Sequence, residues 1–297
     1  MHVTLTPAEV AKAVDVSEST VKRWCDQGRL RCEATPGGHR RVPVGAFVEM
    51  VRQGGFDLAD ASVLGLPAGT GRQESRIGAA VSCLTEALTG GDESACRRII
   101  FGHFLSGERF SAISDRVIAP AFYQIGSLWE EGKLEIYQER RASEIVRRVL
   151  LEARRLLPNP SESAPVALGA TLLCDRYILP TSMIEVVLRE NGWTADLLGT
   201  SLPLNAIVSA IRRHSPKLFW ISVSFLRDEG EFLDEYDRFY DAVGQDVAVV
   251  VGGRALTANV RSQIRYAAFC DTLAQLESFV HVVAGQADEN WVFSNAS

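Results

Sequence analysis

The spacing of hydrophobic positions changes along the chain and divides it into three parts. Residues 1–53 hold short stretches of helical period, residues 73–156 keep that period throughout, and beyond residue 165 short apolar runs alternate with helical stretches. The change predicts an α/β multidomain protein. The expected parts are a head (1–55), a linker (56–72), a four-helix bundle (73–157), a second linker (158–165), a doubly wound parallel α/β domain (166–285) and a C-terminal tail (286–297).

The head begins with two short helices whose starts are marked by capping residues. Thr6-Pro7-Ala8-Glu9 is a capping box with proline at the first helical position, and Ser17 can cap a second helix that runs to about Asp26. Val21 and Trp24 would anchor that helix in the core and leave its polar side chains facing outward. The side chains placed to contact a DNA major groove are Ser19, Thr20, Lys22 and Arg23.

A glycine-rich basic turn follows these helices. In Thr35-Pro36-Gly37-Gly38-His39-Arg40-Arg41 the glycine pair allows a tight reversal, and His39, Arg40 and Arg41 are donors that can meet phosphates. Residues 30–33 and 41–43 would form the strands of this wing, and residues 43–53 a third helix. The pattern predicts a winged helix-turn-helix head, and residues 4–53 resemble the DNA-binding domain of MerR-type regulators. The alternative is a small helical domain with a solvated basic loop.

Charge limits the kind of nucleic-acid contact that the head can make. Residues 1–53 contain eight Lys or Arg and six Asp or Glu, whereas the whole chain has 31 and 37 and a formal net charge of −6. This balance argues against general coating of nucleic acid and leaves one local basic face. A weakly basic reader of this size needs two copies to hold an operator, so we expect a homo-oligomer, a dimer or tetramer, on double-stranded DNA.

Composition argues for a cytoplasmic protein without a membrane span. Apolar runs fall short of the roughly 18 residues that a span requires, and Glu9, Lys12 and Asp15 interrupt any signal peptide. The scattered cysteines predict buried thiols rather than disulfides or zinc ligands. They are Cys25, Cys32, Cys83, Cys96, Cys174 and Cys270. The histidines lack metal-ligand spacing or an evident nucleophile partner, so we expect a protein that is not an enzyme.

The bundle and the α/β domain are predicted from their apolar periods. The bundle helices are expected at 73–89, 92–105, 107–131 and 135–156. The strands are expected at 166–173, 218–224 and 247–251, and the helices of the α/β domain at 180–191, 203–214, 230–243, 257–266 and 272–284. Ligands of such sheets bind beyond the carboxyl ends of the strands, which here means residues 174–180, 222–227 and 252–255.

These two parts also carry a spaced set of motif residues. In the bundle, Trp129 is followed ten residues later by Glu139-Arg140. In the α/β domain, Asp175 precedes Pro180, 41 residues separate Pro180 from Ser222-Val223-Ser224, and 27 more precede Gly252-Gly253. Together with the head, the chain resembles the CarH-like regulators, which are MerR-type repressors whose bundle and Rossmann-like domain clamp cobalamin and respond to light. The resemblance spans nearly the whole chain.

The resemblance implies a cofactor-binding site in the bundle and the α/β domain. Its members would be Trp129, Glu139, Arg140, Asp175, Tyr177, Ser222, Gly252 and Gly253. Each surviving motif residue also has a structural interpretation: Trp129 as a core aromatic, Glu139 as surface charge, Ser222 as a partner of the backbone, and the glycine pair as a strand-to-helix turn.

The sequence departs from the family motif at the positions that coordinate metal. The family's lower axial histidine falls on Tyr177, its upper-face histidine on Arg140, and its motif glycine on Pro180. A phenol is a poor cobalt ligand at neutral pH, and a guanidinium does not ligate metal. Asp175, which in the family orients the lower histidine, has no imidazole to hold. We therefore expect no metal ligand among these residues.

Four functions follow from these observations. The first is a DNA-binding transcriptional regulator whose sensor module binds a corrinoid such as cobalamin, or another tetrapyrrole, without histidine. The second is the same architecture with ligand binding lost, acting through contacts with another regulator protein. The third is a corrinoid enzyme subunit, and the fourth is a haem sensor. The expected cofactor is thus cobalamin, another tetrapyrrole, or none, and no membrane is expected among the partners.

Overall fold

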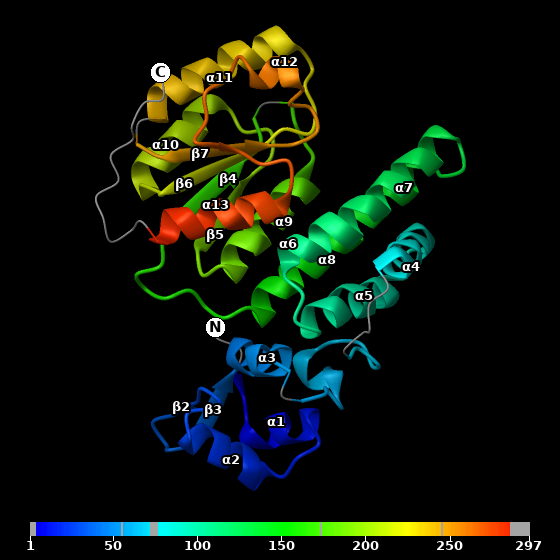
Figure 1. Ribbon diagram of the computed structural model, residues 1–297, viewed down its shortest axis with the longest axis vertical. Helices are drawn as coiled ribbons and strands as arrows, with labels where there is room; N and C mark the ends of the chain where they lie inside the picture. Colours follow the sequence, from blue (N-terminus) through cyan, green and yellow to red (C-terminus); the bar gives the residue numbers. More distant parts are fainter. Residues whose placement is uncertain (1–3, 55, 72–76, 173, 245, 286–297) are drawn as a thin grey trace. The chain divides into compact units, whose positions relative to one another are not determined.

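The computed structural model describes residues 4–54, 56–71, 77–172, 174–244 and 246–285 (Figure 1). These residues cluster into two units, Met1–Asn159 and Pro160–Ser297. The first unit holds the head and the helical bundle, and the second holds the α/β domain. The boundary lies in the proline-rich stretch that the sequence predicts as the second linker.

The head is a winged helix-turn-helix. Its elements are β1 (Thr4–Leu5), α1 (Pro7–Ala13), α2 (Glu18–Asp26), β2 (Glu33–Ala34), β3 (Arg40–Pro43) and α3 (Val44–Arg52), with β3 pairing antiparallel with both β1 and β2. The capping box at Thr6 and the Ser17 cap are formed. The first wing strand begins later than predicted, because Leu30 turns into the core, where it is 1% exposed.

Two cysteines of the head are paired, which corrects the expectation of free thiols. Cys25 in the last turn of α2 forms a disulfide with Cys32, just before β2. The two residues are seven positions apart. Neither the sequence spacing nor the overall composition marks the pair, because the turn between α2 and β2 brings Cys32 back beside the helix.

The segment after α3 is not a loose tether, which corrects its prediction as a linker. Its described residues 56–71 include a 3₁₀ turn, η1 (Ala61–Leu64), that contacts α1. The Phe56 ring lies 4.5 Å from that of Trp24 between centroids, and the Asp60 carboxylate lies 2.8 Å from Lys12 Nζ. Leu58, Leu64 and Leu66 are buried. The Gly and Ser residues of this segment led to its prediction as a flexible linker, although apolar residues that pack lie between them.

The bundle follows the predicted helices closely. Its described elements are α4 (Ile77–Gly90), α5 (Glu93–Leu105), α6 (Phe110–Ile113), η2 (Ser114–Ile118), α7 (Ala119–Glu130) and α8 (Ile136–Leu156). The predicted third helix is thus divided into α6, a π-helical turn η2 and α7. Such turns are uncommon and often mark functional regions. Pro120 is the second residue of α7, which begins directly after η2, and proline is tolerated in such a first turn.

The head and the bundle share contacts within the first unit. Helix α3 contacts α5 and α8. The Arg52 guanidinium donates to the backbone oxygens of Phe104 and Glu108 at 3.1 and 3.0 Å, and lies 4.1 Å from the centre of the Phe104 ring. A Cβ on Gly45 would lie 2.6 Å from Pro158 Cα. The close approach of α3 to the end of α8 therefore requires glycine at position 45.

The second unit is a doubly wound sheet, as predicted. Its strands are β4 (Val166–Ala170), β5 (Thr194–Gly199), β6 (Leu218–Ser222), β7 (Ala248–Gly252) and β8 (Ala268–Phe269). They are parallel, in the order β5-β4-β6-β7-β8. Helices α9 (Ile178–Glu190) and α13 (Leu273–Gly285) contact each other, as do α10 (Leu204–His214) and α11 (Glu229–Val243). Figure 1 shows these pairs on opposite faces of the sheet, with α12 (Ala258–Arg261) on the α11 side.

Two strands of this sheet are absent from the sequence prediction. Strand β5 is an edge strand in which Asp196 is exposed, so its sequence lacks the continuous apolar run of a central strand. Strand β8, at the other edge, has only two residues. The predicted helix at 257–266 is shortened to α12, because the chain must leave the helix to form β8. Within the described residues, no helix is both long enough and apolar enough to span a bilayer.

Candidate functional site

The outward face of α2 carries the residues predicted to read DNA. Ser19, Lys22 and Arg23 are exposed, and Lys22 Nζ is 2.7 Å from Glu18, four residues earlier on the same helix. Thr20 is half-buried, and its hydroxyl lies 2.9 Å from that of Ser17 at the cap. The hydroxyls and cations therefore share the solvent side of a helix whose opposite side is fixed by Val21 and Trp24.

The predicted wing is a tight hairpin tip between β2 and β3. The Thr35 amide donates to the His39 carbonyl at 2.9 Å, the Gly38 amide donates back to Thr35 at 2.8 Å, and Gly38 has φ +76°. His39 at this tip is exposed. The turn thus requires glycine at position 38, where other residues are strained.

The wing lies beside the recognition helix and is bound to it. The Arg40 guanidinium is 2.6 Å from the Asp26 carboxylate at the end of α2, and Cys32 is bonded to Cys25. Arg40 is therefore held by a partner in the protein, while Arg41, its half-buried neighbour, remains in the strand. Sequence reasoning missed Asp26 because the contact joins residues 14 positions apart.

The second candidate region is the carboxyl edge of the sheet. The strand order β5-β4-β6-β7-β8 reverses direction between β4 and β6, which creates the crevice where doubly wound domains bind ligands. The loops after β4 and β6 meet there. Asp175, Tyr177 and Ser222, all predicted site residues, are brought together at this edge with Gly252 and Gly253.

Asp175 joins the two loops through backbone hydrogen bonds. One carboxylate oxygen accepts from the Tyr177 amide at 2.9 Å, and the other accepts from the amides of Ser224 and Phe225 at 2.6 and 3.4 Å. The residue is 3% exposed, and burial raises the pKa of its carboxyl, against the opposing effect of these bonds and of Arg254. Asp175 thus holds the backbone of both loops and has no oxygen without a partner.

The glycine pair closes the same edge from β7. Ser222 lies opposite Gly252 in the sheet register, and the Val223 amide donates to the Gly252 carbonyl at 2.8 Å. A Cβ on Gly252 would lie 2.6 Å from the Cys270 carbonyl oxygen, and one on Gly253 would lie 2.3 Å from that of Val223. Close approach of the backbone therefore accounts for both glycines.

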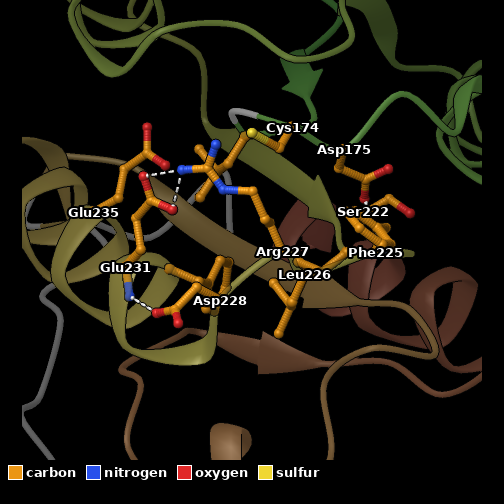
Figure 2. Close-up of a pocket in the computed structure, with 12 residues that line it drawn as sticks. Cys174, Asp175, Ser222, Phe225, Leu226, Arg227, Asp228, Glu231 and Glu235 are labelled. Carbon is orange, nitrogen blue, oxygen red and sulfur yellow. Dashed lines mark hydrogen bonds and ion pairs between the residues drawn. The ribbon is translucent and has the colours of Figure 1, made fainter.

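Two arginines that the sequence did not single out border this edge. The Arg254 guanidinium is 5.5 Å from the centre of the Tyr177 ring, an arrangement in which cation and aromatic face attract each other. Arg227 pairs with Glu231 on α11, as Figure 2 shows. Arg227 and Glu231 line a pocket with Cys174, Asp175 and Ser222 that has a volume of about 20 Å³, which is enough for one water molecule.

The face of the sheet toward α9 is filled by Trp220. Its indole is fully buried, donates to the Thr181 hydroxyl at 2.8 Å, and lies where a Cβ on Gly169 would be 1.8 Å away. The glycine in β4 thus makes room for the indole. A glycine in the middle of an apolar strand signals close approach of a neighbour, but the sequence does not say which residue approaches.

The predicted site residues of the bundle lie on its outside. Trp129, at the end of α7, is 48% exposed, so it is not a core aromatic. Arg140 on α8 is exposed and lies 3.5 Å from Glu139, which is partly buried. Tyr123 on α7 and Tyr137 on α8 are also exposed. The bundle therefore presents aromatic and charged side chains to its surroundings. Among the residues described in the two units, no cluster of three or more His, Cys, Asp or Glu could hold a metal ion.

Comparison with known proteins finds matches to two separate segments of the chain. Residues 4–55 match the family described as a helix-turn-helix domain, and residues 83–152 match the B12 binding domain. The HTH-type transcriptional repressor CarH of Myxococcus xanthus is 27% identical over 177 residues, which is 59% of this chain. The match covers 54% of that repressor, so the chain spans about half the length of the relative.

A solved structure shares the fold of the bundle and the α/β domain. The monomethylamine corrinoid protein of Methanosarcina barkeri superposes with a TM-score of 0.58 at 15% identity, over 69% of this chain and 99% of that protein. The chain therefore contains segments that match a helix-turn-helix domain and the B12 binding domain family, and the CarH-like resemblance predicted from the sequence is confirmed.

The residues at the sheet edge do not fit a cobalamin held through histidine. Position 177 offers a phenol instead of an imidazole, and Asp175 is occupied by three amides. The Trp220 indole fills the space between the sheet and α9. Pro180 adds a ring in the first turns of α9. At this edge Asp175 and the glycine pair take part in backbone hydrogen bonds and close backbone packing.

Proposed function

We propose that this CarH-like chain is a DNA-binding transcriptional regulator in which a winged head is joined to a sensor module on a corrinoid-protein scaffold. The observation that carries the proposal is the placement of the wing: a tight basic hairpin held beside the exposed face of α2 by the Arg40–Asp26 ion pair. Such an arrangement lets one helix enter a major groove while a hairpin contacts the adjacent phosphates.

The head also separates this proposal from a corrinoid enzyme subunit. The corrinoid protein with the shared fold is covered almost completely by 69% of this chain, whereas the helix-turn-helix match covers residues 4–55. We infer that the chain is a regulator and not an enzyme. Its proposed partners are double-stranded operator DNA and further copies of itself, because one small basic face gives too few phosphate contacts to hold an operator alone.

Duplex selection with a matched pair of arginine variants tests the DNA-binding role. Duplexes enriched from a random-sequence library by the wild type would be titrated at several salt concentrations. Arg41→Ala removes one cation from the wing, so we expect binding roughly threefold to tenfold weaker and a salt slope lower by about one. Arg213→Ala on α10, an exposed arginine of the other unit, is the control and should bind like the wild type.

Two results would contradict this assignment. Failure of the wild type to enrich any duplex would reject the regulator proposal. Equal affinity of Arg41→Ala and wild type, at every salt concentration, would reject the wing as a phosphate contact. It would not count against DNA binding by α2. Gel filtration of each variant would show that oligomer size is unchanged.

For the sensor module, two alternatives each rest on an observation. Exposed Trp129 and Tyr137 on the bundle support a flat tetrapyrrole bound without histidine, because aromatic side chains offer apolar area to such a ring. The filled sheet edge, with Trp220 against Gly169 and Asp175 satisfied, supports a module that has lost its ligand and acts through protein contacts. Both predict that no cobalt–imidazole bond forms.

Absorption spectra separate the two alternatives. Protein dialysed against hydroxocobalamin, and in parallel against haemin, retains a corrin or Soret spectrum in the first case and is colourless in the second. Tyr177→His supplies the missing imidazole, but Pro180 and Trp220 still occupy the space of a tail, so we expect no base-off, histidine-bound spectrum. Appearance of that spectrum in the variant would show that the space is not closed.

A further inference from the structure

The strongest connection between the recognition helix and the wing is covalent. Cys25 lies in the last turn of α2, and Cys32 is the residue before β2. Their Cα atoms are 5.7 Å apart, within the range at which a disulfide forms without movement of the backbone. The same backbone can therefore hold the pair as two thiols or as one disulfide.

The other connections at this junction are weaker. The Arg40–Asp26 ion pair is exposed, with side-chain exposures of 39% and 59%, so solvent and salt screen it. Strand β2 has two residues and pairs only through Glu33 and Ala34. Leu30 is buried and anchors the middle of the connecting turn. Opening the disulfide would therefore leave the head folded around Leu30 but give the base of the wing more freedom.

The two cysteines of the head, Cys25 and Cys32, are partly exposed residues. By contrast, Cys96 is fully buried in the bundle, and burial raises the pKa of its thiol to about 12. Burial also raises the pKa of the Cys270 thiol to about 11. Such thiols react slowly, because the thiolate is the reactive form. Cys83 is exposed. Cys25 and Cys32 differ from it in lying close enough to each other to form an internal disulfide.

We propose that Cys25 and Cys32 form a thiol–disulfide switch that sets the affinity of the head for DNA. This inference rests on the proposed function, because it assigns a regulatory input to the same DNA-binding head. A head that works on chromosomal DNA meets a compartment in which thiols are kept reduced, and a disulfide that forms there is usually transient and redox-sensing. The oxidant is a low-molecular-weight disulfide such as oxidised glutathione.

The exchange balances in two steps. The thiolate of one cysteine attacks one sulfur of the small disulfide, breaks its S–S bond and forms a mixed disulfide, releasing one small thiol. The thiolate of the second cysteine then attacks the protein sulfur of the mixed disulfide, releases the other small thiol and leaves the Cys25–Cys32 bond. Two protein thiols are oxidised, one small disulfide is reduced, and the two protein protons end on the released thiols.

The direction of the effect follows from the freedom of the wing. In the oxidised head the hairpin is fixed beside α2 before DNA arrives, whereas the reduced head must order the base of the hairpin on binding. Ordering flexible groups at an interface weakens association. We therefore expect the oxidised protein to bind its selected duplex roughly threefold to tenfold more tightly than the reduced protein.

The test uses the full chain and the duplex selected by the oxidised wild type. Affinity would be measured after incubation with oxidised glutathione and after reduction with dithiothreitol. Cys25→Ser and Cys32→Ser should each bind with the affinity of the reduced wild type under both conditions. Cys83→Ser, which replaces an exposed thiol on α4, is the matched control and should keep the full redox dependence.

Peptide mapping confirms the bond independently of DNA binding. Without reductant, tryptic peptides 24–29 and 32–40 should remain linked, since Arg29 and Arg31 are cleaved between the two cysteines. Equal affinity of oxidised and reduced wild type, with the bond verified, would overturn the inference, as would redox dependence that survives in Cys25→Ser. If neither form enriches any duplex, the proposed function fails instead, so the two failures are distinguishable.

Discussion

Two pairs of adjacent glycines occur in the wing and at the end of β7, and the structure uses them in opposite ways. A Cβ on Gly38 would meet no atom within 4 Å, whereas one on Gly253 would lie 2.3 Å from the Val223 carbonyl oxygen. The first pair keeps an exposed hairpin tip small. The second lets two loops of the sheet edge touch. The same dipeptide thus marks an open approach surface in one place and a closed packing contact in the other.

The charged residues around the two glycine pairs also differ in their exposure. At the wing, the cations Arg40 and Arg41 lie beside an exposed tip. At the sheet edge, Asp175 is buried and accepts three backbone amides. The wing leaves His39 exposed and its arginines partly exposed, whereas the sheet edge has its carboxylate buried. A residue that matches a family motif therefore indicates a similar fold. Whether that residue can bind a ligand depends on the contacts that it makes.

The largest expected difference between the two regions is in stability. Gly253→Ala places a methyl group against backbone that cannot rotate away, at φ +117°, so we expect a loss of about 3 kcal/mol or more in free energy of unfolding. Gly38→Ala meets only the strain of a positive φ, +76°, with a loss of about 1 kcal/mol. Calorimetry would measure the losses.

Hydrogen exchange would then assign each loss to a unit. Peptides from β6 and β7 should lose protection in Gly253→Ala and keep it in Gly38→Ala. If both variants unfold alike, the distinction between an open and a closed glycine pair is wrong. A stable Gly253→Ala protein would show that the sheet edge is looser than these contacts indicate.

A smaller difference is expected in the titration of two aspartates. Lys12 and then Ser62 lower the pKa of Asp60 in the head to about 2, whereas burial raises that of Asp175 above its ordinary 3.8. The Asp60 contribution to stability is therefore present above pH 3.8 and lost as pH falls toward 2. The Asp175 contribution has the opposite sign: it is full below pH 3.8 and declines as pH rises through the folded pKa.

NMR of carboxyl carbons would resolve both titrations. Asp175→Asn should remove the titration of the Asp175 carboxyl. Because an amide group would then face three backbone donors, the free energy of unfolding should also fall by about 1–3 kcal/mol. Lys12→Ala should move the Asp60 titration back toward 3.8 without changing that of Asp175. Titration of Asp175 below 3.8 would show that the hydrogen bonds outweigh burial at the sheet edge.

Local sequence signals predicted the head well because its structure depends on neighbours along the chain. The capping box at Thr6, the cap at Ser17 and the turn at Gly38 each join residues within four positions of one another. The bundle helices were predicted to within a few residues for the same reason, since the apolar period is sustained. The π-helical turn η2 was not predicted, because its sequence fits an ordinary helix equally well.

Contacts between distant residues were beyond sequence reasoning. The polar edge strand β5 is recognised only once β4 lies beside it. The pairing of Arg40 with Asp26 and of Cys25 with Cys32 depends on where the hairpin returns. At the sheet edge the sequence named Asp175, Ser222 and the glycines, but not that three backbone amides would donate to the Asp175 carboxylate. The filling of the α9 face by Trp220 requires knowing that its neighbour across the sheet is Gly169.

The contact of α3 with the bundle has a consequence for recombining this protein. A transplant of residues 1–55 onto a foreign sensor would separate Arg52 from the carbonyls of Phe104 and Glu108, and would expose the bare backbone at Gly45 that Pro158 covers. The exchangeable cassette ends instead at Asn159, where the first unit ends. Chimeras should therefore be joined in the proline-rich stretch after α8.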